Sequence, residues 1–439
     1  MAGASIAMAL YSLLILALLA LGAPYWLLRI AGGGRYRAGL WGRLGRVPAE
    51  LRAAVAGRDV VWVHAVSVGE VLAATRLVAG LEAALGESWI ILISTTTATG
   101  QKLAQDRFGT ARVFWYPLDF AWAVRAYLRA LQPKLLVLME SELWPRMLVE
   151  CARNGIPVAV VNARVSDRSF ARGVKVRAVW GRVLRMVTIF LAQSEEDARR
   201  LLAMGACAES VQAIGNLKYD VRAVQEGRMV QQILKWADGR SVFVAGSTCG
   251  LDPDGPNTQE EQIVADAWDR ALRARKDSIL VLAPRHPERF SYGEMVAAGY
   301  VYRNASGSPS DEAYPEQVET VLLDTIGDLA AVYSVADLAF VGGSLISKGG
   351  HNPLEPAQFA VPVIMGPSFE NFREIVGKMQ AADGIRIVQD KNELETALVE
   401  LLTDREKAKA MGERGQRVFE AQQGATARAV EALVELVKQ

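Results

Sequence analysis

Cysteine and histidine are scarce in this chain, which contains three of each among its 439 residues. The cysteines, Cys151, Cys207 and Cys249, are far apart and odd in number. They form no disulfide framework, and such sparse use of cysteine fits a reducing compartment. Because the chain also has no C-x-x-C or H-E-x-x-H motif, the sequence predicts no metal site.

An excess of charge of either sign is missing as well, because 49 basic and 48 acidic side chains leave a net charge of +1. A charge so close to zero provides no argument for a nucleic-acid partner, and we expect none. A chain of 439 residues is longer than one ordinary core, so two domains are expected.

Charged side chains are absent from Met1 to Leu28, and the part from Ile6 to Leu21 is almost wholly apolar. A membrane span needs roughly 20 apolar residues, so this segment is long enough. Several arginines precede the first acidic residue, Glu50. They are Arg29, Arg35, Arg37, Arg43 and Arg46. The positive-inside rule then predicts an anchor helix within residues 1–31 and a cytoplasmic location for the rest of the chain. A signal peptide or a buried core helix is the alternative, although a signal peptide would carry a basic start.

Beyond this segment, apolar runs of strand length alternate with helical patterns. The first series is Val60–Val66, Trp89–Ser94, Leu135–Met139, Val158–Asn162 and Ile189–Gln193. The second series is Ser241–Ala245, Ser278–Ala283, Val318–Leu323, Leu338–Val341 and Val363–Met365. Apolar runs between helical patterns indicate parallel strands that helices cover on both faces.

A polar stretch, Gly215–Asp220, separates the two series. We therefore predict an α/β protein with two doubly wound, Rossmann-like domains, residues 32–216 and 217–439, that face each other across a cleft. The closing stretch Asp404–Gln439 has a helical pattern and could cross back to the first domain.

Glu70 follows the apolar run Val60–Val66 after a short turn, Ser67-Val68-Gly69, and a helical pattern continues to Val78. Ligands of parallel sheets bind at the carboxyl ends of the strands, where a carboxylate can act as a base. Ser67 and Glu70 also have the S-x-x-E spacing of a capping box, which stabilises a helix start without any catalytic role. The spacing alone leaves both interpretations open.

Glu140 directly follows the apolar run Leu135–Met139. A carboxylate at the end of a buried strand costs free energy unless it is paired or hydrated, which makes Glu140 a better site candidate than Glu142. Lys218, near the polar join, and Arg285, at another strand end, are the basic candidates. The planar guanidinium of an arginine suits phosphate or carboxylate, but taken alone each of these side chains is more often a solvated surface charge.

Glycine turns lie at two places in the second half of the chain. Gly343 and Ser344 end a strand, and a helix start follows Gly349-Gly350-His351. In that helix start Asn352 suits the N-cap, Pro353 the first helical position and Glu355 the third position after the cap. Exposed N–H groups at such turns bind phosphate, so we predict a phosphate cradle here.

Several of these segments resemble the lipid A Kdo transferases (3-deoxy-D-manno-octulosonic acid transferases), which are membrane-anchored GT-B glycosyltransferases of lipopolysaccharide assembly. The matching blocks are Trp62-Val63-His64-Ala65-Val66-Ser67-Val68-Gly69-Glu70, Ala283-Pro284-Arg285-His286-Pro287-Glu288-Arg289-Phe290 and Gly349-Gly350-His351-Asn352-Pro353-Leu354-Glu355-Pro356. The resemblance covers nearly the whole chain in order. One departure is that Cys249 and the loop Gly250–Gln259 replace a shorter turn that contains histidine or an acidic residue in relatives.

The resemblance implies a role for each candidate. Glu70 is the general base, and Glu140 and Lys218 stabilise the transition state. The residues that contact CMP are Pro284, Arg285, Ile326, Gly327, Asp328, Asn352, Pro353, Leu354 and Glu355. The turn Ile326-Gly327-Asp328 is the weaker match, because relatives commonly have M-G-E there. Gly343 and Ser344 are further candidates for donor binding.

The resemblance thus implies an inverting transferase that moves Kdo from CMP-Kdo to a lipid A precursor of the lipid IVA type, without metal or cofactor. It also implies an inner-membrane anchor with the catalytic domains on the cytoplasmic side. Two other interpretations stay open from the residues themselves. One is a different GT-B nucleotide-sugar enzyme, such as an epimerase or a UDP-sugar transferase. The other is a membrane-tethered nucleotide- or lipid-binding protein without activity.

Overall fold

The computed structural model describes residues 39–220, 227–250, 259–274, 277–291, 302–304 and 318–438, together with Tyr11, Leu21 and Val296. The predicted anchor helix within residues 1–31 lies outside them, apart from Tyr11 and Leu21. Within the described part of the chain, no helix is both long enough and apolar enough to cross a membrane.

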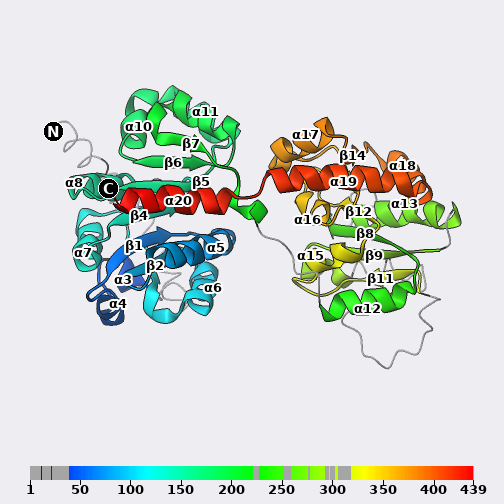
Figure 1. The fold of residues 1–439 in the computed structure, drawn as a ribbon, viewed down its shortest axis with the longest axis horizontal. Helices are drawn as coiled ribbons and strands as arrows, with labels where there is room; N and C mark the ends of the chain where they lie inside the picture. The colour runs from blue at the N-terminus through cyan, green and yellow to red at the C-terminus, as the bar shows by residue number, and fades with distance from the viewer. Residues whose placement is uncertain are drawn as a thin grey trace. The chain divides into compact units, whose positions relative to one another are not determined.

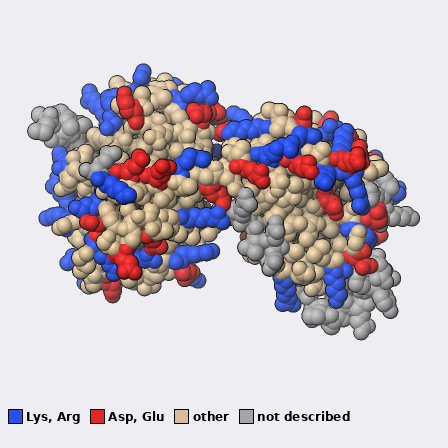
Figure 2. All heavy atoms as spheres, in the orientation of Figure 1, with Lys and Arg blue, Asp and Glu red and all other residues tan. Residues whose placement is uncertain are grey.

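The chain divides into two compact units. Unit 1 consists of Met1–Asp220 and Gly424–Gln439, and unit 2 of Val221–Gln423. The predicted domain boundary followed residue 216, and the observed division follows Asp220. Over the face of each unit that Figure 2 shows, basic and acidic side chains are interspersed, as the near-zero net charge of the chain would suggest.

Unit 1 is built on a parallel sheet of seven strands in the order β3-β2-β1-β4-β5-β6-β7 (Figure 1). The strands are β1 Asp59–His64, β2 Trp89–Thr95, β3 Val113–Trp115, β4 Leu135–Met139, β5 Val158–Ala163, β6 Ile189–Ala192 and β7 Val211–Ala213. The chain runs outward from β1 in one direction and then from β4 in the other. This reversal between β1 and β4 is the switch point at which doubly wound sheets bind ligands.

Helices cover both faces of this sheet because its strands are apolar on both faces. The helices of unit 1 are α3 Leu40–Arg43, α4 Ala49–Ala54, α5 Val68–Leu85, α6 Ala98–Phe108, α7 Ala121–Leu131, α8 Pro145–Arg153, α9 Asp167–Lys175, α10 Arg177–Leu184, α11 Glu195–Met204 and α20 Ala425–Lys438. On one face Trp62 packs in a cluster with side chains of α7, α8, α10 and α11. On the other face Val61 and Val63 pack with side chains of α5, α6 and α20.

The predicted helical stretch Asp404–Gln439 forms two helices, α19 Arg405–Ala421 and α20, which are separated at Gly424. Figure 1 shows α20 in red among the blue and green elements of unit 1. The carboxylate of Asp220 binds the backbone at the start of α20. Its Oδ1 accepts from the N–H of Gly424 at 2.7 Å, and its Oδ2 accepts from the N–H of Thr426. The residue at which the chain leaves unit 1 therefore caps the helix with which it returns.

Unit 2 has a second parallel sheet of seven strands in the order β10-β11-β9-β8-β12-β13-β14. The strands are β8 Ser241–Thr248, β9 Ser278–Pro284, β10 Tyr302–Asn304, β11 Thr320–Leu322, β12 Leu338–Val341, β13 Val363–Met365 and β14 Ile385–Ile387. Its switch point lies between β8 and β12. The prediction of an α/β protein with two parallel sheets is confirmed.

The helices of unit 2 are α12 Arg228–Ala237, α13 Glu260–Ala274, α15 Leu329–Val332, α16 Leu354–Ala357, α17 Arg373–Ala381, α18 Lys391–Thr403 and α19. Phe243 of β8 lies in a buried cluster with side chains of α13, α18 and α19. Its neighbours Val242 and Val244 face the other side and pack against α12 and α15. Alternate residues of β8 therefore pack into two hydrophobic clusters, one on each face of the sheet.

Each predicted apolar run coincides with a strand of the structure, whereas four strands were not predicted: β3, β7, β10 and β14. All four are three residues long and form the two edges of each sheet. Strands β11 and β13 are equally short but lie inside the sheet and were predicted, so it is their edge position that sets these four strands apart.

Candidate functional site

The two predicted catalytic carboxylates of unit 1 flank its switch point. Glu70 lies in the first turn of α5, which follows β1 after a short connection, and Glu140 directly follows β4. β1 and β4 are hydrogen-bonded neighbours, with His64 opposite Leu138. The fold therefore brings both side chains to the carboxyl edge of the sheet at the point where ligands bind.

Glu70 is held through both of its carboxylate oxygens. The N–H of Val66 donates to Oε2 at 2.8 Å, and the hydroxyl of Ser67 donates to Oε1 at 2.9 Å. Ser67 is the N-cap of α5, but its side chain accepts no hydrogen bond from the helix N–H groups. The reciprocal capping box suggested by the S-x-x-E spacing is thus not formed, and the Ser67 hydroxyl instead orients the Glu70 carboxylate.

Burial raises the pKa of the Glu70 carboxyl above its ordinary value, because only 7% of the residue is exposed. The hydrogen bonds from Val66 and Ser67 oppose this shift, and the negative charges of Glu140 and Glu142 add to it. A carboxylate whose pKa is raised toward neutrality is a stronger base than an ordinary one, which is what proton abstraction requires.

Lys218 and Glu140 form an ion pair, with the ammonium Nζ 2.8 Å from Oε1. Lys218 lies in a 3₁₀ helix, η3 Leu217–Asp220, at the end of the first segment of unit 1. The side chains are 46% and 29% exposed, so a ligand can reach the pair. The structure therefore brings together two residues that the sequence could only suggest separately.

Glu140 adopts a left-handed backbone conformation with φ of 57°. Such a conformation costs a residue with a side chain about 1–3 kcal/mol and is often found at functional sites. The pKa of the neighbouring Glu142 is raised by burial and by the charge of Glu140. The charge of Glu140 therefore raises the pKa of both Glu70 and Glu142 at one edge of the sheet, and Lys218 is the counter-charge of Glu140.

At the switch point of unit 2 a buried carboxylate, Glu260, binds a ring of backbone N–H groups. It accepts from Gly343 at 2.5 Å, from Ser344 at 2.9 Å and from Leu345 at 2.8 Å. The N–H of Cys249, which follows β8, donates to it at 3.0 Å. Burial raises the pKa of Glu260 to about 7, against the opposing effect of these four hydrogen bonds.

This geometry corrects the predicted phosphate cradle at the first glycine turn. The N–H groups of Gly343 and Ser344 already bind the carboxylate of Glu260, so they are not available to a phosphate in this structure. Any other contact of these two residues with the donor stays a prediction. Sequence reasoning missed Glu260, although it precedes Val264 and Trp268 at helical spacing and so belongs to the buried face of α13.

Arg285, Asn352 and Glu355 of the predicted CMP site do come together. Burial raises the pKa of Glu355, and the positive charge of Arg285 and a hydrogen bond with Asn352 oppose this shift. Arg285 follows β9, where its N–H donates to the carbonyl of Thr248 at 2.9 Å. Its side chain is exposed, so the guanidinium can meet a ligand. His351 lies in the same group, because burial and then the charges of Arg285 and His286 lower its pKa to about 4.

The helix start beyond Asn352 differs slightly from the prediction. α16 begins at Leu354 with Pro353 as its N-cap, one residue later than expected. The amide oxygen of Asn352 nevertheless accepts from the N–H of Leu354 at 3.1 Å, as a capping side chain does. Leu354 is buried, and its contact with a nucleotide stays a prediction. Pro284, the last residue of β9, pairs with Thr248 in the sheet.

The turn Ile326-Gly327-Asp328 directly precedes α15. Among the described residues, we find no hydrogen bond or ion pair that joins it to Arg285 or Glu355. The side chain of Ile326 is 81% exposed, which is unusual for an apolar residue, and Gly327 has a φ of 97°. An exposed apolar side chain beside a tight turn is compatible with stacking on a base, and the role of the turn stays a prediction.

The loop at which we expect this chain to depart from the family pattern begins at Cys249. The thiol lies 3.5 Å from Nε2 of His351, and burial raises its pKa to about 11, so that it is protonated. Gly250 and Gln259 pair in a short antiparallel bridge that closes the loop. Residues 251–258 lie outside the described residues.

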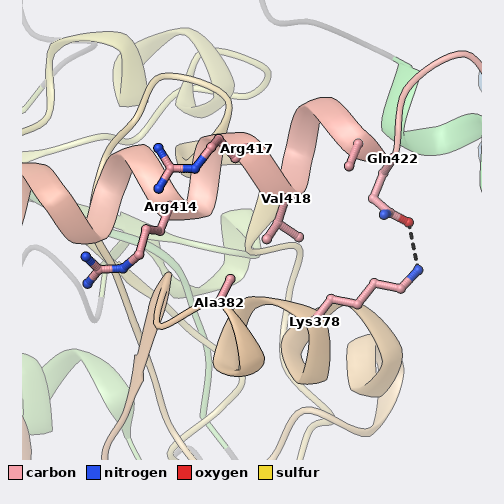
Figure 3. A pocket seen from close by; sticks show the side chains of 7 residues that line it. Lys378, Ala382, Arg414, Arg417, Val418 and Gln422 are labelled. Atoms are coloured by element: carbon pink, nitrogen blue, oxygen red, sulfur yellow. Dashed lines mark hydrogen bonds between the residues drawn. The ribbon is translucent and has the colours of Figure 1, made fainter.

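A pocket of about 340 Å³ lies in unit 2 between α17 and α19 (Figure 3). In this view Lys378 points toward Gln422, to which its ammonium donates at 3.0 Å, and Arg414 and Arg417 extend from α19. None of the predicted donor-binding residues lines this pocket. It is therefore not part of the site that Arg285 and Glu355 define.

Comparison with known proteins agrees with the resemblance. A family model described as 3-deoxy-D-manno-octulosonic-acid transferase (kdotransferase) matches residues 38–221. A 3-deoxy-D-manno-octulosonic acid transferase of Haemophilus influenzae is 32% identical over 85% of this chain and 86% of that protein. One of Bordetella pertussis is 34% identical over 93% of this chain and 94% of that protein.

Among solved structures, a UDP-GlcNAc 2-epimerase from Neisseria meningitidis bound to UDP-GlcNAc aligns with a TM-score of 0.59. The alignment covers 86% of this chain and 100% of the epimerase at 11% identity, so it shows the fold alone. The two parallel α/β units thus form a GT-B-like two-domain fold. With two relatives above 30% identity along most of its length, the chain belongs to the 3-deoxy-D-manno-octulosonic acid transferases, a family of glycosyltransferase enzymes.

Proposed function

We propose that this enzyme transfers Kdo from CMP-Kdo to a lipid A precursor of the lipid IVA type in lipopolysaccharide core biosynthesis, with inversion at the anomeric carbon. The observation that carries the proposal is the Glu70 carboxylate at the switch point of unit 1. It is fixed by Val66 and Ser67, and its pKa is raised by burial. A base of this kind suits the removal of a proton from a sugar hydroxyl.

In the proposed reaction the acceptor hydroxyl oxygen attacks the anomeric carbon of Kdo while Glu70 takes the hydroxyl proton. The bond between the anomeric carbon and the phosphate oxygen breaks, and CMP leaves with the bonding electrons. One displacement by one nucleophile inverts the anomeric configuration. Lys218 and Glu140 stabilise the charge that develops in the transition state, since fixed charges need no reorganisation during the reaction.

The donor nucleotide is assigned to unit 2. The residues proposed to contact CMP are Pro284, Arg285, Ile326, Gly327, Asp328, Asn352, Pro353, Leu354 and Glu355. The grouping of Arg285, Asn352 and Glu355 at the carboxyl ends of β9 and β12 supports this assignment, because a guanidinium there offers a planar set of donors to a phosphate. We propose no metal or cofactor for the reaction.

We further propose that residues 1–31 anchor the enzyme in the inner membrane, with both units on the cytoplasmic side. The charge-free segment Met1–Leu28 and the arginines before Glu50 support this topology. An anchor keeps the enzyme in the plane of its amphiphilic acceptor. A reporter fused after Gln439 is expected to read as cytoplasmic, and a periplasmic signal would overturn the topology.

The activity is tested by incubating the full-length enzyme with CMP-Kdo and a tetraacyl lipid A precursor, followed by mass spectrometry of the lipid. We expect the mass of the lipid to rise by one or more Kdo residues, and Glu70→Gln to abolish most of the increase. Parallel reactions with UDP-sugars test the alternative donor class. Modification only with a UDP-sugar would overturn the donor assignment, and no modification with any donor would favour a binding protein without activity.

A further inference from the structure

Two neighbouring strands of unit 1 end at residues with a left-handed backbone that are not glycine. Glu140, after β4, has a φ of 57°, and Asn162, near the end of β5, has a φ of 60°. Asn162 is also the extra residue of a β-bulge, since Val161 pairs with Leu191 and Ala163 pairs with Ala192. A bulge redirects the side chain of the inserted residue and is frequent beside active sites.

The redirected amide of Asn162 binds the segment that carries Lys218. Asn162 is fully buried, and its Oδ1 accepts from the N–H of Leu217 at 3.0 Å. Because that N–H is a donor, only the amide oxygen can face it, which determines the orientation of the amide. The amide oxygen of Asn162 therefore accepts a hydrogen bond from Leu217, the residue directly before Lys218.

Gln193, which follows β6, links Asn162 to Asn216 through two further hydrogen bonds. Its Nε2 donates to the carbonyl of Asn162 at 3.0 Å, and its Oε1 accepts from Nδ2 of Asn216 at 3.1 Å. Oδ1 of Asn216 in turn accepts from the N–H of Lys218 at 3.0 Å. The ends of β5 and β6 thus hold three successive residues, Asn216, Leu217 and Lys218, through side-chain hydrogen bonds.

These hydrogen bonds to residues 216–218 matter because few neighbouring atoms surround the side chain of Lys218. The Lys218 side chain is 46% exposed, and its ammonium meets Glu140 at 2.8 Å. A long side chain on a mobile backbone would lose this geometry, and misplacement of a catalytic group by about 1 Å can cost about 100-fold in rate. The segment also follows Gly215, which has a φ of 95°.

We infer that Asn162, assisted by Gln193, is a positioning residue that fixes the backbone of residues 216–218 so that Lys218 meets Glu140. The inference rests on the proposed function, which assigns the catalytic role to Lys218 and Glu140. Asn162 acts through Lys218 and is not expected to touch either substrate.

The test is a double-mutant cycle in the full-length enzyme with Asn162→Gly and Lys218→Ala. Glycine adopts a φ of 60° without strain, so Asn162→Gly removes the amide and keeps the bulge. We expect Asn162→Gly to lower kcat at least about tenfold, within the range for a misplaced group, with KM for CMP-Kdo unchanged. In the Lys218→Ala background the same change should cause no further loss, because residues that act as one unit are not additive.

Asn154→Gly is the matched control, because it removes an asparagine side chain of unit 1 whose Nδ2 donates to the carbonyl of Glu150 at 2.7 Å. It should leave kcat within about twofold, as expected of an exposed surface position. If Asn162→Gly does not fold, Gln193→Met takes its place in the cycle, because methionine keeps the length of the side chain and removes both amide hydrogen bonds.

The outcomes separate the two levels of the proposal. Wild-type turnover in Lys218→Ala would overturn the catalytic role of Lys218 and with it the basis of the inference. A large effect of Lys218→Ala together with an independent, multiplicative loss from Asn162→Gly would overturn the inference alone. A change in KM without a change in kcat would also contradict it, because positioning of Lys218 concerns the transition state.

Discussion

The hydroxyl of Ser67 donates to Oε1 of Glu70 at 2.9 Å, while the N–H of Val66 donates to Oε2 at 2.8 Å. Both oxygens of the proposed base are thus occupied in one defined orientation. Glu70→Gln preserves this arrangement, because the amide oxygen can accept from Val66 and the amide nitrogen can donate to the Ser67 oxygen. Only the ability to take up a proton is lost.

We therefore expect Glu70→Gln to fold normally and to lower turnover about 10²- to 10⁴-fold, the usual contribution of a general base. Turnover is measured with CMP-Kdo and the lipid acceptor. Ser67→Ala is the companion variant, with a smaller loss expected, because it disturbs the orientation of the base and leaves the carboxylate. Turnover of Glu70→Gln within a few-fold of wild type would return Glu70 to a purely structural role at the helix start.

The same substitution has a pH-dependent effect on stability. Because the folded-state pKa of Glu70 is raised, the folded protein holds this proton more tightly than the unfolded chain, and stability falls as the pH rises through the raised pKa. The glutamine variant lacks this titration. We expect its melting temperature relative to wild type to be higher at pH 8 than at pH 5, and an equal difference at both would contradict the raised pKa.

The ion pair between Lys218 and Glu140 should contribute more to activity than to stability. Both side chains are partly exposed, and such pairs contribute about 0.2–1 kcal/mol to folding. We expect Lys218→Met and Glu140→Gln each to change the melting temperature only slightly but to lower kcat by at least about tenfold, as loss of electrostatic stabilisation does. Lys134→Met, at an exposed pair with Asp59 in the same unit, is the control and should leave kcat unchanged.

The donor site is tested by calorimetric titration with CMP. Hydrogen bonds to charged groups contribute about 1.5–3 kcal/mol, so Arg285→Ala and Glu355→Ala should each weaken binding by about 10- to 100-fold. Arg414→Ala, in the pocket of Figure 3, is the control within unit 2 and should bind CMP normally. Unchanged affinity in both test variants would show that the nucleotide site has been misplaced.

Removal of the carboxylate of Glu260 should loosen the glycine turn that follows β12. Glu260→Ala leaves the N–H groups of Gly343, Ser344 and Leu345 without their acceptor. Each buried unsatisfied group costs about 1–3 kcal/mol, so we expect a marked loss of stability in unit 2. Hydrogen exchange of these three amides should become fast, whereas in the exposed-site control Glu288→Ala it stays slow. Equal protection in Glu260→Ala would exclude the anchoring role.

His64 should make unit 1 sensitive to acid. Burial lowers its pKa to about 3, from an ordinary value of 6.5, so between these values the unfolded chain binds a proton that the folded protein does not. Stability then falls on acidification by about 1.4 kcal/mol per pH unit within this window. We expect His64→Gln to flatten the fall in melting temperature between pH 6.5 and pH 4. An unchanged slope in His64→Gln would contradict the lowered pKa.

Local sequence was sufficient to predict the central strands and the residues at their ends. β4 and β12 coincide with the predicted apolar runs, because a parallel strand buried on both faces must be apolar throughout. The positions of Glu70 and Glu140 followed from the same pattern, since Glu140 directly follows such a strand and Glu70 follows another after a short turn. The resemblance then supplied their proposed roles, which the spacing alone could not.

Contacts between distant parts of the chain were decided only by the tertiary structure. Glu140 and Lys218 are 78 residues apart, and Glu260 and Gly343 are 83 residues apart. Such pairs depend on the order of the strands in the sheet, because parallel strands bring their carboxyl ends to one edge whatever their separation in the chain. The three-residue edge strands have the same origin, since pairing with a neighbour, and not their own composition, makes them strands.

The amino-acid sequence by itself therefore determined the α/β class, the two series of parallel strands and the family. Apolar periodicity and short motifs are local properties, which a chain displays before it folds. The tertiary structure decided which buried carboxylate binds the N–H groups of Gly343 and Ser344, and which strand ends support Lys218. Burial and hydrogen-bond partners arise from packing, so Glu260 and Asn162 acquire their roles only in the folded protein.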